Sequence, residues 1–420
     1  MRIALVHDYI KEYGGAERVL EALHEIWPKS PIFTTVYLPE FLGPHKERFK
    51  DWDIRTSFLQ YLPFKEKLIS PFRIIAPFVF KNFDLSKFDV VIVSATGAYS
   101  PNGIKIKNQK SKIKNAVQIC YSHTPPRYLY GYATAREWKK NLIFRVIGEI
   151  GNHFLRLVDF KSSQNVDYFI ANSKNVGERI KKFYRREAEV IYPPVAIDGR
   201  RWKMEGSNLK IEDRRLIHPL SSTIKRPSSI FYHQPSNKDY FLAGGRLARP
   251  KHIDLIVEAC RELKVPLKVF GRAFARANIK YQISKIKNTY QKSNIIEYVG
   301  EVSDEERLEL MRNAKAYIFA AEDEDFGITP VEAMSVGTPV IAYKSGGVVE
   351  SVVDPSTSSG RFATGLFFDE LTVEGLKRTI QQFNNLTINP SDCIKQAGKF
   401  SKERFKKEIK EFVESKLRLI

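Results

Sequence analysis

The sequence has few cysteines and no long apolar segment. Its three cysteines, Cys120, Cys260 and Cys393, are scattered over 420 residues. Such scattered cysteines predict neither a disulfide framework nor a metal site, and they are typical of a reducing compartment. No run of about 18 uncharged apolar residues is present, so we expect no membrane-spanning helix. Met1 leads directly into a strand-like run, so we expect no signal peptide and a cytoplasmic protein.

Acidic residues are few relative to basic ones. The chain has 68 basic and 48 acidic residues, a formal net charge of +20 and a pI near 9.6. This charge favours anionic partners such as nucleic acid, anionic lipid or phosphorylated ligands. The hydrophobic content of 43% is that of a globular chain. A chain of this length is expected to form two domains of roughly 200 residues.

The most informative stretch covers residues 316–342. Residues 316–319 form a short apolar run that is typical of a buried strand. After an acidic loop we expect a helix that Thr329 caps, with Pro330 at its first position, where no N–H is needed. A second strand is expected over residues 340–342.

This arrangement predicts a ligand site at the start of the helix. A helix N-terminus at the carboxyl edge of a parallel sheet has free N–H groups, which bind a phosphate or a polar sugar. Gly327 has no side chain, so the backbone can approach a ligand closely. Glu324 and Glu332 flank the helix start, and their carboxylates can accept hydrogen bonds from hydroxyl groups. A ligand rich in hydroxyls and phosphate, such as a nucleotide sugar, fits this combination.

The N-terminal half begins with a similar unit. Residues 3–6 read as a buried strand, and residues 19–23 as part of a helix. Between them lie Gly14 and Gly15, in a turn that suits a phosphate. The dinucleotide pattern Gly-x-Gly-x-x-Gly is absent. A tight turn that needs glycine only for its shape is the alternative.

Polar residues follow a second buried strand in this half. Residues 88–94 and 116–121 read as strands, and the latter leads into His123 and Arg127. Ligands of α/β folds lie at the carboxyl ends of strands. A lone histidine is more often structural, and Arg127 could equally form a simple salt bridge.

The C-terminal half offers two cations at a strand end. Arg246 and Lys251 follow the apolar residues 240–243, and together they can clamp a diphosphate. Solvated surface cations are the alternative. Pro193-Pro194 reads as a hinge between the halves, and residues 200–238 as an insertion that is partly β and partly loop.

Four motifs together resemble the retaining glycosyltransferases of family 4. They are Glu-Asp-Phe-Gly-Ile-Thr-Pro-Val-Glu-Ala-Met at 324–334, Gly-Gly-Ala-Glu-Arg at 14–18, His-Thr-Pro-Pro-Arg-Tyr-Leu at 123–129 and Gly-Arg-Leu-x-x-x-Lys at 245–251. The resemblance covers nearly the whole chain except the insertion. Where the family usually has glycine after this lysine, the chain has His252.

The resemblance implies an α/β fold of the GT-B type, with two Rossmann-like domains facing across a cleft. The N-terminal acceptor domain would span residues 1–195, and a C-terminal helix over 402–420 would pack back on it. The donor domain would span residues 196–401 and include the insertion.

The resemblance also implies roles for individual residues. His123 and Glu324 would be catalytic. Donor-binding residues would be Gly14, Gly15, Arg246, Lys251, Gly271, Arg272, Val299, Phe326, Gly327, Ile328, Thr329 and Glu332. Acceptor contacts would come from Tyr9, Arg127 and Tyr128. No Asp-x-Asp motif stands in a suitable place, and the cations would neutralise the diphosphate, so we expect no metal and no cofactor besides the nucleotide-sugar donor.

One of these motifs implies a donor, and a basic, aromatic segment bears on the acceptor. The His-Thr-Pro-x-Arg-Tyr-Leu motif resembles mannosyltransferase-like members and implies GDP-mannose, with a UDP-sugar as the alternative. Residues 52–83 are basic and aromatic, so they form either core-facing helices or a surface that lies on an anionic membrane and receives a lipid-linked acceptor. We expect peripheral association with the inner face of the cell membrane.

Four alternative classes compete with this one. A nucleic-acid-binding protein would explain the charge, but no recognisable nucleic-acid module appears, so no nucleic acid is expected. A non-catalytic nucleotide-sugar binder would keep Arg246 and Lys251, and an epimerase would share the fold. A glycosidase pair is disfavoured, because eight residues of helix rise about 12 Å, whereas such carboxylates lie about 5–9.5 Å apart.

Overall fold

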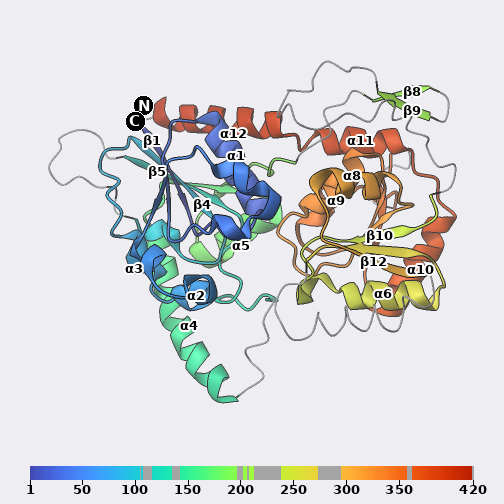
Figure 1. Ribbon diagram of the computed structural model, residues 1–420, viewed down its shortest axis with the longest axis horizontal. Helices are drawn as coiled ribbons and strands as arrows, with labels where there is room; N and C mark the ends of the chain where they lie inside the picture. Colours follow the sequence, from blue (N-terminus) through green and yellow to red (C-terminus); the bar gives the residue numbers. More distant parts are fainter. Residues whose placement is uncertain are drawn as a thin grey trace.

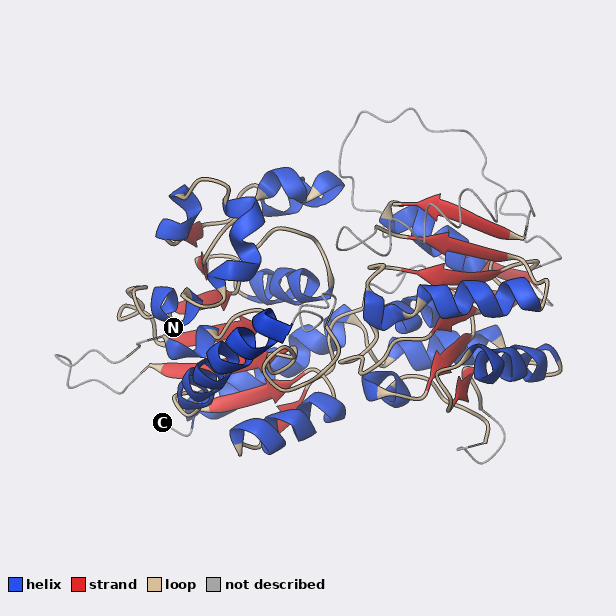
Figure 2. Cartoon of the chain, turned by 90° about the horizontal axis from the view of Figure 1, so that it is seen from below, coloured by secondary structure: helices blue, strands red, loops and turns tan. Residues whose placement is uncertain are grey.

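The computed structural model describes residues 1–104, 106, 116–134, 142–195, 202–205, 208–211, 238–272, 295–356 and 362–418 of the chain. These residues form two α/β domains that lie side by side (Figure 1). Helices flank both faces of the central sheet in each domain (Figure 2). The expected α/β fold with two Rossmann-like domains is confirmed.

The N-terminal domain is built on a seven-stranded parallel sheet in the order β3-β2-β1-β4-β5-β6-β7. Its strands are β1 (Ile3–His7), β2 (Ile32–Thr34), β3 (Ile54–Thr56), β4 (Val90–Ala95), β5 (Val117–Ser122), β6 (Tyr168–Ala171) and β7 (Ala188–Val190). The strands expected from the apolar runs at 3–6, 88–94 and 116–121 are therefore confirmed as β1, β4 and β5.

Helices cover both faces of this sheet. They are α1 (Gly15–Ile26), α2 (Lys65–Phe72), α3 (Ala76–Phe80), α4 (Leu142–Ser163) and α5 (Lys174–Tyr184). Along β1, Ile3 and Leu5 face the core beneath α1, whereas Ala4 and Val6 face the core beneath α3 and α5. A strand buried on both faces explains why it reads as a continuous apolar run rather than an alternating one.

The C-terminal domain repeats this plan with a six-stranded parallel sheet in the order β12-β11-β10-β13-β14-β15. Its strands are β10 (Phe241–Gly244), β11 (Leu267–Phe270), β12 (Ile296–Gly300), β13 (Tyr317–Phe319), β14 (Val340–Tyr343) and β15 (Gly365–Phe368). Its helices are α6 (Ile253–Glu262), α8 (Asp304–Arg312), α9 (Ile328–Ser335), α10 (Val373–Asn384) and α11 (Pro390–Gly398).

The last helix, α12 (Lys402–Arg418), lies on the N-terminal domain beside α1 (Figure 1). Its buried residues Phe405 and Ile409 share a core with Leu20 and Leu23 of α1. Two of its lysines also pair with Glu25 at 2.7 and 3.0 Å. The chain thus returns to its first domain after completing the second.

One local prediction is wrong. Helix α9 begins at Ile328 with Gly327 as its N-cap, so Thr329 is not the cap and Pro330 stands at the third position instead of the first. Gly327 has a φ of +88°, a left-handed conformation that lets the chain turn into the helix earlier than expected. Pro330 is tolerated there because the first four N–H groups of a helix have no intrahelical partner.

The insertion is described only in part. Strands β8 (Trp202–Glu205) and β9 (Asn208–Ile211) pair in an antiparallel two-stranded sheet, as expected for a partly β segment. The rest of the predicted insertion up to residue 237 lies outside the described residues. Among the helices described, none combines the length and the apolar character needed to cross a bilayer.

Candidate active site

Loops at the carboxyl ends of strands in one sheet contact their counterparts in the other. Arg127, in the loop after β5, donates from Nη2 to the carbonyl oxygen of Asp323 at 2.6 Å and pairs with Asp325 Oδ1 at 2.8 Å. Both aspartates lie in the loop after β13. Since parallel sheets place ligands at these strand ends, this boundary between the domains is the candidate active site.

The acidic loop is fixed by two more residues of the N-terminal domain. Arg179 of α5 donates from Nη1 to Asp325 Oδ1 at 2.7 Å, and Ser173 Oγ donates to the carbonyl oxygen of Asp325 at 2.6 Å. The Arg179 side chain is almost fully buried. A buried charge is stable only when paired and hydrogen-bonded, so these contacts hold the backbone beside Glu324 in place.

A second carboxylate joins the domains at the start of α5. Glu350 accepts hydrogen bonds from the backbone N–H groups of Lys174 and Asn175 at 2.8 and 2.9 Å. The positive end of the helix dipole favours a carboxylate there.

Glu324 pairs with one of the two predicted diphosphate cations. Lys251, in the turn after β10, places Nζ 2.5 Å from Glu324 Oε2. Burial raises the pKa of Glu324, but the positive charges of Lys251 and Arg127 outweigh burial and hold that pKa below its ordinary value. Glu324 is therefore an ionised carboxylate surrounded by cations.

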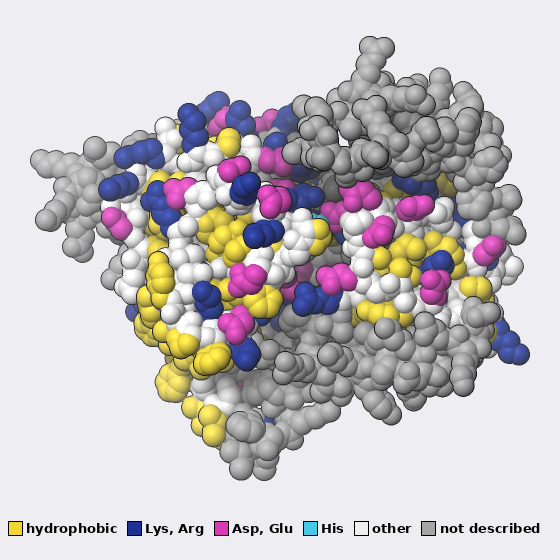
Figure 3. Space-filling model, in the orientation of Figure 1, with side chains coloured by type: hydrophobic (Ala, Val, Ile, Leu, Met, Phe, Trp, Pro, Cys, Tyr) yellow, Lys and Arg dark blue, Asp and Glu magenta, His cyan; other side chains and the backbone are white. Residues whose placement is uncertain are grey.

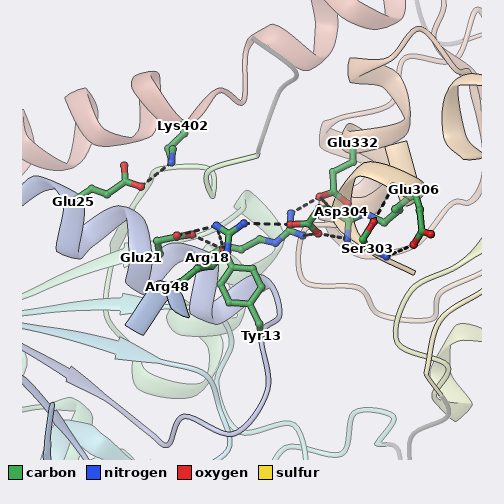
Figure 4. Close-up of polar contacts among 11 residues, drawn as sticks. Tyr13, Arg18, Glu21, Glu25, Arg48, Ser303, Asp304, Glu306, Glu332 and Lys402 are labelled. Atoms are coloured by element: carbon green, nitrogen blue, oxygen red, sulfur yellow. Dashed lines mark hydrogen bonds and ion pairs between the residues drawn. The ribbon is translucent and has the colours of Figure 1, made fainter. Parts of the chain in front are cut away.

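Glu332 lies at the centre of a second charged cluster (Figure 4). Its side chain is buried, and Oε1 accepts hydrogen bonds from Arg18 of the N-terminal domain and, at 3.0 Å, from Arg307 of α8. Arg18 also pairs with Asp304 at 3.4 Å, and Arg48 pairs with the same aspartate at 3.5 Å. Burial lowers the pKa of Arg18, but the charges of Glu332 and Asp304 outweigh that effect and raise it.

The other predicted cation also reaches across the boundary. Arg246, after β10, forms an ion pair with Glu12 in the loop after β1. Half of the Arg246 side chain is exposed. Arg246 and Lys251 are therefore each paired with a carboxylate, and Glu332 is paired with two guanidinium groups. The pairs Arg246–Glu12 and Arg18–Glu332 join the two domains.

The predicted glycine turn at Gly14 and Gly15 lies against the start of α9. A Cβ atom on Gly15 would lie 2.9 Å from Ile328 Cδ1 across the domain boundary, and one on Gly245, in the same domain as α9, would lie 3.8 Å from Thr329 Oγ1. Gly14, beside Gly15, is the N-cap of α1. The structure therefore brings the glycine turn before α1 to the first residues of α9.

Gly271 and Arg272 lie next to this region. A Cβ on Gly271 would lie 1.9 Å from the carbonyl oxygen of Gly245, and Leu247 N donates to the carbonyl oxygen of Arg272 at 3.1 Å. Val299 lies on the edge strand β12 and lines a cavity of about 430 Å³ together with Val302, Lys268 and residues of α8.

Phe326 contributes no exposed side chain to the site. It is buried and packs against Tyr192 and Phe400, with ring centroids 5.5 and 5.3 Å apart. Any contact of Phe326 with a donor would therefore use its backbone, next to the left-handed Gly327.

His123 is buried among residues of its own domain. Its Nε2 lies 3.0 Å from Ser94 Oγ, which lies 3.1 Å from His7 Nδ1, and its ring packs edge-on against Tyr121. Burial lowers the pKa of His123 to about 3, so its imidazole is neutral at pH 7. The hydrogen bonds fix the ring, and a neutral ring can both donate and accept.

The predicted acceptor residues have aromatic and cationic neighbours. Tyr9 packs against Tyr99 with ring centroids 5.4 Å apart, and the Arg73 guanidinium lies 4.4 Å above the ring of Tyr128. Arg127, beside Tyr128, is held by the acidic loop as described above.

Sequence reasoning missed Arg18, Arg179 and Asp325 as residues of this site. Arg179 carried a readable signal, because it follows Val176 by three positions and so lies on the buried stripe of α5. Within the described part of the chain, no group of three or more His, Cys, Asp or Glu side chains is arranged to hold a metal ion.

Family comparisons agree with this geometry. The description "Glycosyltransferase Family 4" matches residues 13–198, and "Glycosyl transferases group 1" matches residues 227–400. The two matches together cover most of the chain, with one family region for each of the two domains.

Two curated relatives show the level of similarity. The chain is 27% identical over 180 residues to an uncharacterized glycosyltransferase of Methanocaldococcus jannaschii, covering 42% of this chain and 46% of the relative. It is 23% identical over 299 residues to the alpha-1,3/1,6-mannosyltransferase ALG2 of Dictyostelium discoideum, covering 66% of this chain and 64% of the relative. The matches thus span less than two thirds of each relative.

Solved structures share the fold over the full length. A sucrose-phosphate synthase from Thermosynechococcus elongatus superposes with a TM-score of 0.66 at 16% identity, covering 100% of both chains. The Anabaena protein HepE in complex with UDP and glucose superposes with a TM-score of 0.62 at 15% identity, covering 99% of this chain and 100% of HepE. The two family matches show that the chain belongs to the glycosyltransferases of family 4, and the likeness to these structures shows that it has the GT-B fold.

Proposed function

We propose that this protein is a retaining hexosyltransferase that moves mannose from GDP-mannose to a glycan or lipid-linked acceptor in surface polysaccharide or glycolipid synthesis. The observation that supports it most is the ion pair of Lys251 and Glu324 at the carboxyl edge of the second sheet, at the boundary with the N-terminal domain. It combines a phosphate-binding cation with a hydroxyl-binding carboxylate at one position.

Donor binding would exchange partners within the site. A diphosphate carries more negative charge than a carboxylate and can replace Glu12 on Arg246 and Glu324 on Lys251. Glu324 would then accept hydrogen bonds from the sugar hydroxyls, and Glu332 from the ribose hydroxyls. Arg246 and Lys251 would thus hold the donor by its diphosphate and the two glutamates by its sugars.

In the transfer step, the bond from the anomeric carbon to the diphosphate oxygen breaks, and the electron pair leaves with the nucleoside diphosphate. The acceptor hydroxyl oxygen forms the new bond to that carbon, and its proton passes to the released diphosphate. Charge therefore builds up on the diphosphate, where Arg246 and Lys251 stabilise it. The neutral ring of His123 would position a hydroxyl of the transferred sugar.

The identity of the donor rests on the motif at 123–129 and on the similarity to ALG2 mannosyltransferases. A UDP-sugar is the alternative, since the same fold accommodates UDP in HepE. The test incubates the chain with a panel of GDP- and UDP-sugars and measures which nucleotide is released, with the Glu324→Gln variant as the control. Release of GDP from GDP-mannose by the native chain alone supports the proposal, and release of UDP only would remove the mannose assignment.

For the acceptor, we propose a glycan on a lipid carrier, with the enzyme bound peripherally at the inner face of the cell membrane. The charge of +20 supports an anionic surface as a partner. Nucleic acid is the competing anionic partner. Salt-sensitive binding to DNA that is tighter than binding to anionic vesicles would favour that competitor.

A further inference from the structure

Helix α4 is amphipathic in the opposite sense to an ordinary surface helix. Among the described side chains of α4, the buried ones are polar, namely Asn152, Asp159, Ser162 and Ser163. Its exposed side chains include the large apolar residues Val146, Ile147, Ile150, Phe154 and Leu157. A surface helix of a globular domain normally turns its apolar stripe toward the core.

The polar inner side of α4 has specific partners. Asp159 accepts hydrogen bonds from Ser100 Oγ at 2.7 Å and Tyr130 Oη at 2.9 Å. Arg156 donates to the carbonyl oxygen of Leu129 at 2.9 Å, and Asn152 Nδ2 donates to that of Tyr128 at 3.4 Å. The inner side thus supports the loop that carries Arg127 and Tyr128, which explains why the apolar stripe faces outward.

A second set of exposed apolar residues continues this surface. In and around α2 and α3, the structure exposes Phe58, Tyr61, Leu62, Phe64, Ile74, Ile75 and Phe78. The short buried helix η4 (Pro101–Gly103) contacts both α3 and α4, so these two helices lie near each other. Figure 3 shows hydrophobic side chains gathered along the lower left edge of the molecule, over α2, α3 and α4. We call these two sets together the apolar face.

Basic side chains lie among these apolar ones. Lys67 Nζ lies 5.4 Å from the ring centroid of Phe64, and Lys81 Nζ lies 5.4 Å from that of Phe78. Residues 58–81 contain four basic residues and one acidic residue. Exposed aromatic rings beside lysines are typical of surfaces that lie at a lipid–water interface, where the ring enters the headgroup region and the amine binds lipid phosphate.

We propose that the apolar face is the surface by which this protein lies on an anionic lipid bilayer, with the outer stripe of α4 in the headgroup region. The choice of lipid over a second copy of the chain follows from charge. In a two-fold interface the basic residues of one copy would face those of the other, whereas anionic headgroups complement them. This inference deepens the peripheral membrane binding of the proposed function by naming the surface that makes the contact, and the inner side of that surface supports the loop expected to meet a lipid-linked acceptor.

The test measures sedimentation of the full chain with vesicles of phosphatidylcholine and phosphatidylglycerol, and with vesicles of phosphatidylcholine alone. The variant carries Ile150→Glu and Phe154→Glu, both at exposed positions, so its thermal melting should match that of the native chain. The matched control carries Gln381→Glu and Gln382→Glu, which add the same charge at exposed positions on α10.

The native chain and the control should bind the anionic vesicles, and the α4 variant should bind at least about tenfold more weakly. Equal binding of all three proteins would overturn the inference, as would a native dimer in light scattering that the α4 variant converts to a monomer. Binding of GDP without vesicles is measured in parallel. If the α4 variant loses vesicle binding but binds GDP as the native chain does, the result supports the assignment of this surface. If the native chain binds vesicles but does not bind GDP, the result contradicts the proposed donor and leaves this inference standing.

Discussion

Arg18 forms an ion pair with Glu332, 314 positions later in the chain, and this contact joins the two domains. Arg307 binds the same carboxylate oxygen at 3.0 Å. Glu332 is the residue expected to hold the ribose of the donor. A ribose that binds there must share the carboxylate with two guanidinium groups or replace Arg18. We therefore expect this pair to couple donor binding to the arrangement of the domains.

Arg18→Ala should destabilise the protein strongly. Removing one partner of a buried ion pair costs about 3 kcal/mol, because the remaining charge loses part of its compensation. Arg378→Ala is the matched control, since Arg378 pairs with Glu370 on an exposed surface, where such a pair is worth less than about 1 kcal/mol. Thermal melting of the native chain and both variants measures the loss of stability that each substitution causes. Equal melting shifts for the two variants would contradict the assigned role of Arg18.

Lys251→Ala should weaken the binding of GDP by about 10- to 100-fold, since hydrogen bonds to charged groups contribute about 1.5–3 kcal/mol. The control is Lys344→Ala, because Lys344 pairs with Asp369 on the surface of the same domain. Calorimetric titration with GDP gives both affinities. If Lys251→Ala binds GDP as tightly as the control does, Lys251 is not a diphosphate ligand.

Glu324 should make the stability of the protein depend on pH. Its folded pKa is held below the ordinary value of 4.5 by Lys251 and Arg127, even though burial alone would raise it. Its contribution is therefore fully present above pH 4.5 and is lost as the pH falls through the folded pKa. The difference in melting temperature between the native chain and Glu324→Gln should be constant from pH 8 to about pH 5 and should shrink below that. A difference that grows as the pH falls would contradict the ion pair.

His123 should remain neutral well below pH 6.5. Burial lowers its pKa from 6.5 to about 3, so at pH 5 the unfolded chain takes up a proton that the folded chain does not. Stability is therefore complete above pH 6.5 and falls below it, by about 2 kcal/mol at pH 5. The variant His123→Asn should not show this loss. Proton titration of the His123 ring by NMR measures the pKa directly, and a midpoint near 6.5 would refute the buried, neutral histidine.

The parallel strands and the fold class could be predicted from the sequence. The apolar residues 3–6, 90–93 and 316–319 are buried in parallel sheets, and burial on both faces leaves a signal in every residue of the strand. The polar residues that follow the apolar segments 240–243 and 316–319 also indicated that Arg246, Lys251 and Glu324 lie after strand ends.

Contacts between the domains could not be predicted in this way. The pairing of Arg18 with Glu332 depends on how two separately folded sheets are oriented, and no local periodicity reports that orientation. The start of α9 was misplaced because Thr329 looks like a cap, whereas the left-handed conformation of Gly327 begins the helix earlier. The outward stripe of α4 has the same 3.6-residue spacing as an inward one, so the pattern alone does not give its direction.

A structure determined with bound GDP-mannose tests the central claim most directly. We predict that the diphosphate contacts Arg246 and Lys251, that the ribose hydroxyls contact Glu332, and that the mannose hydroxyls contact Glu324. A nucleotide bound elsewhere, with Lys251 still on Glu324 and Arg246 still on Glu12, would contradict the account.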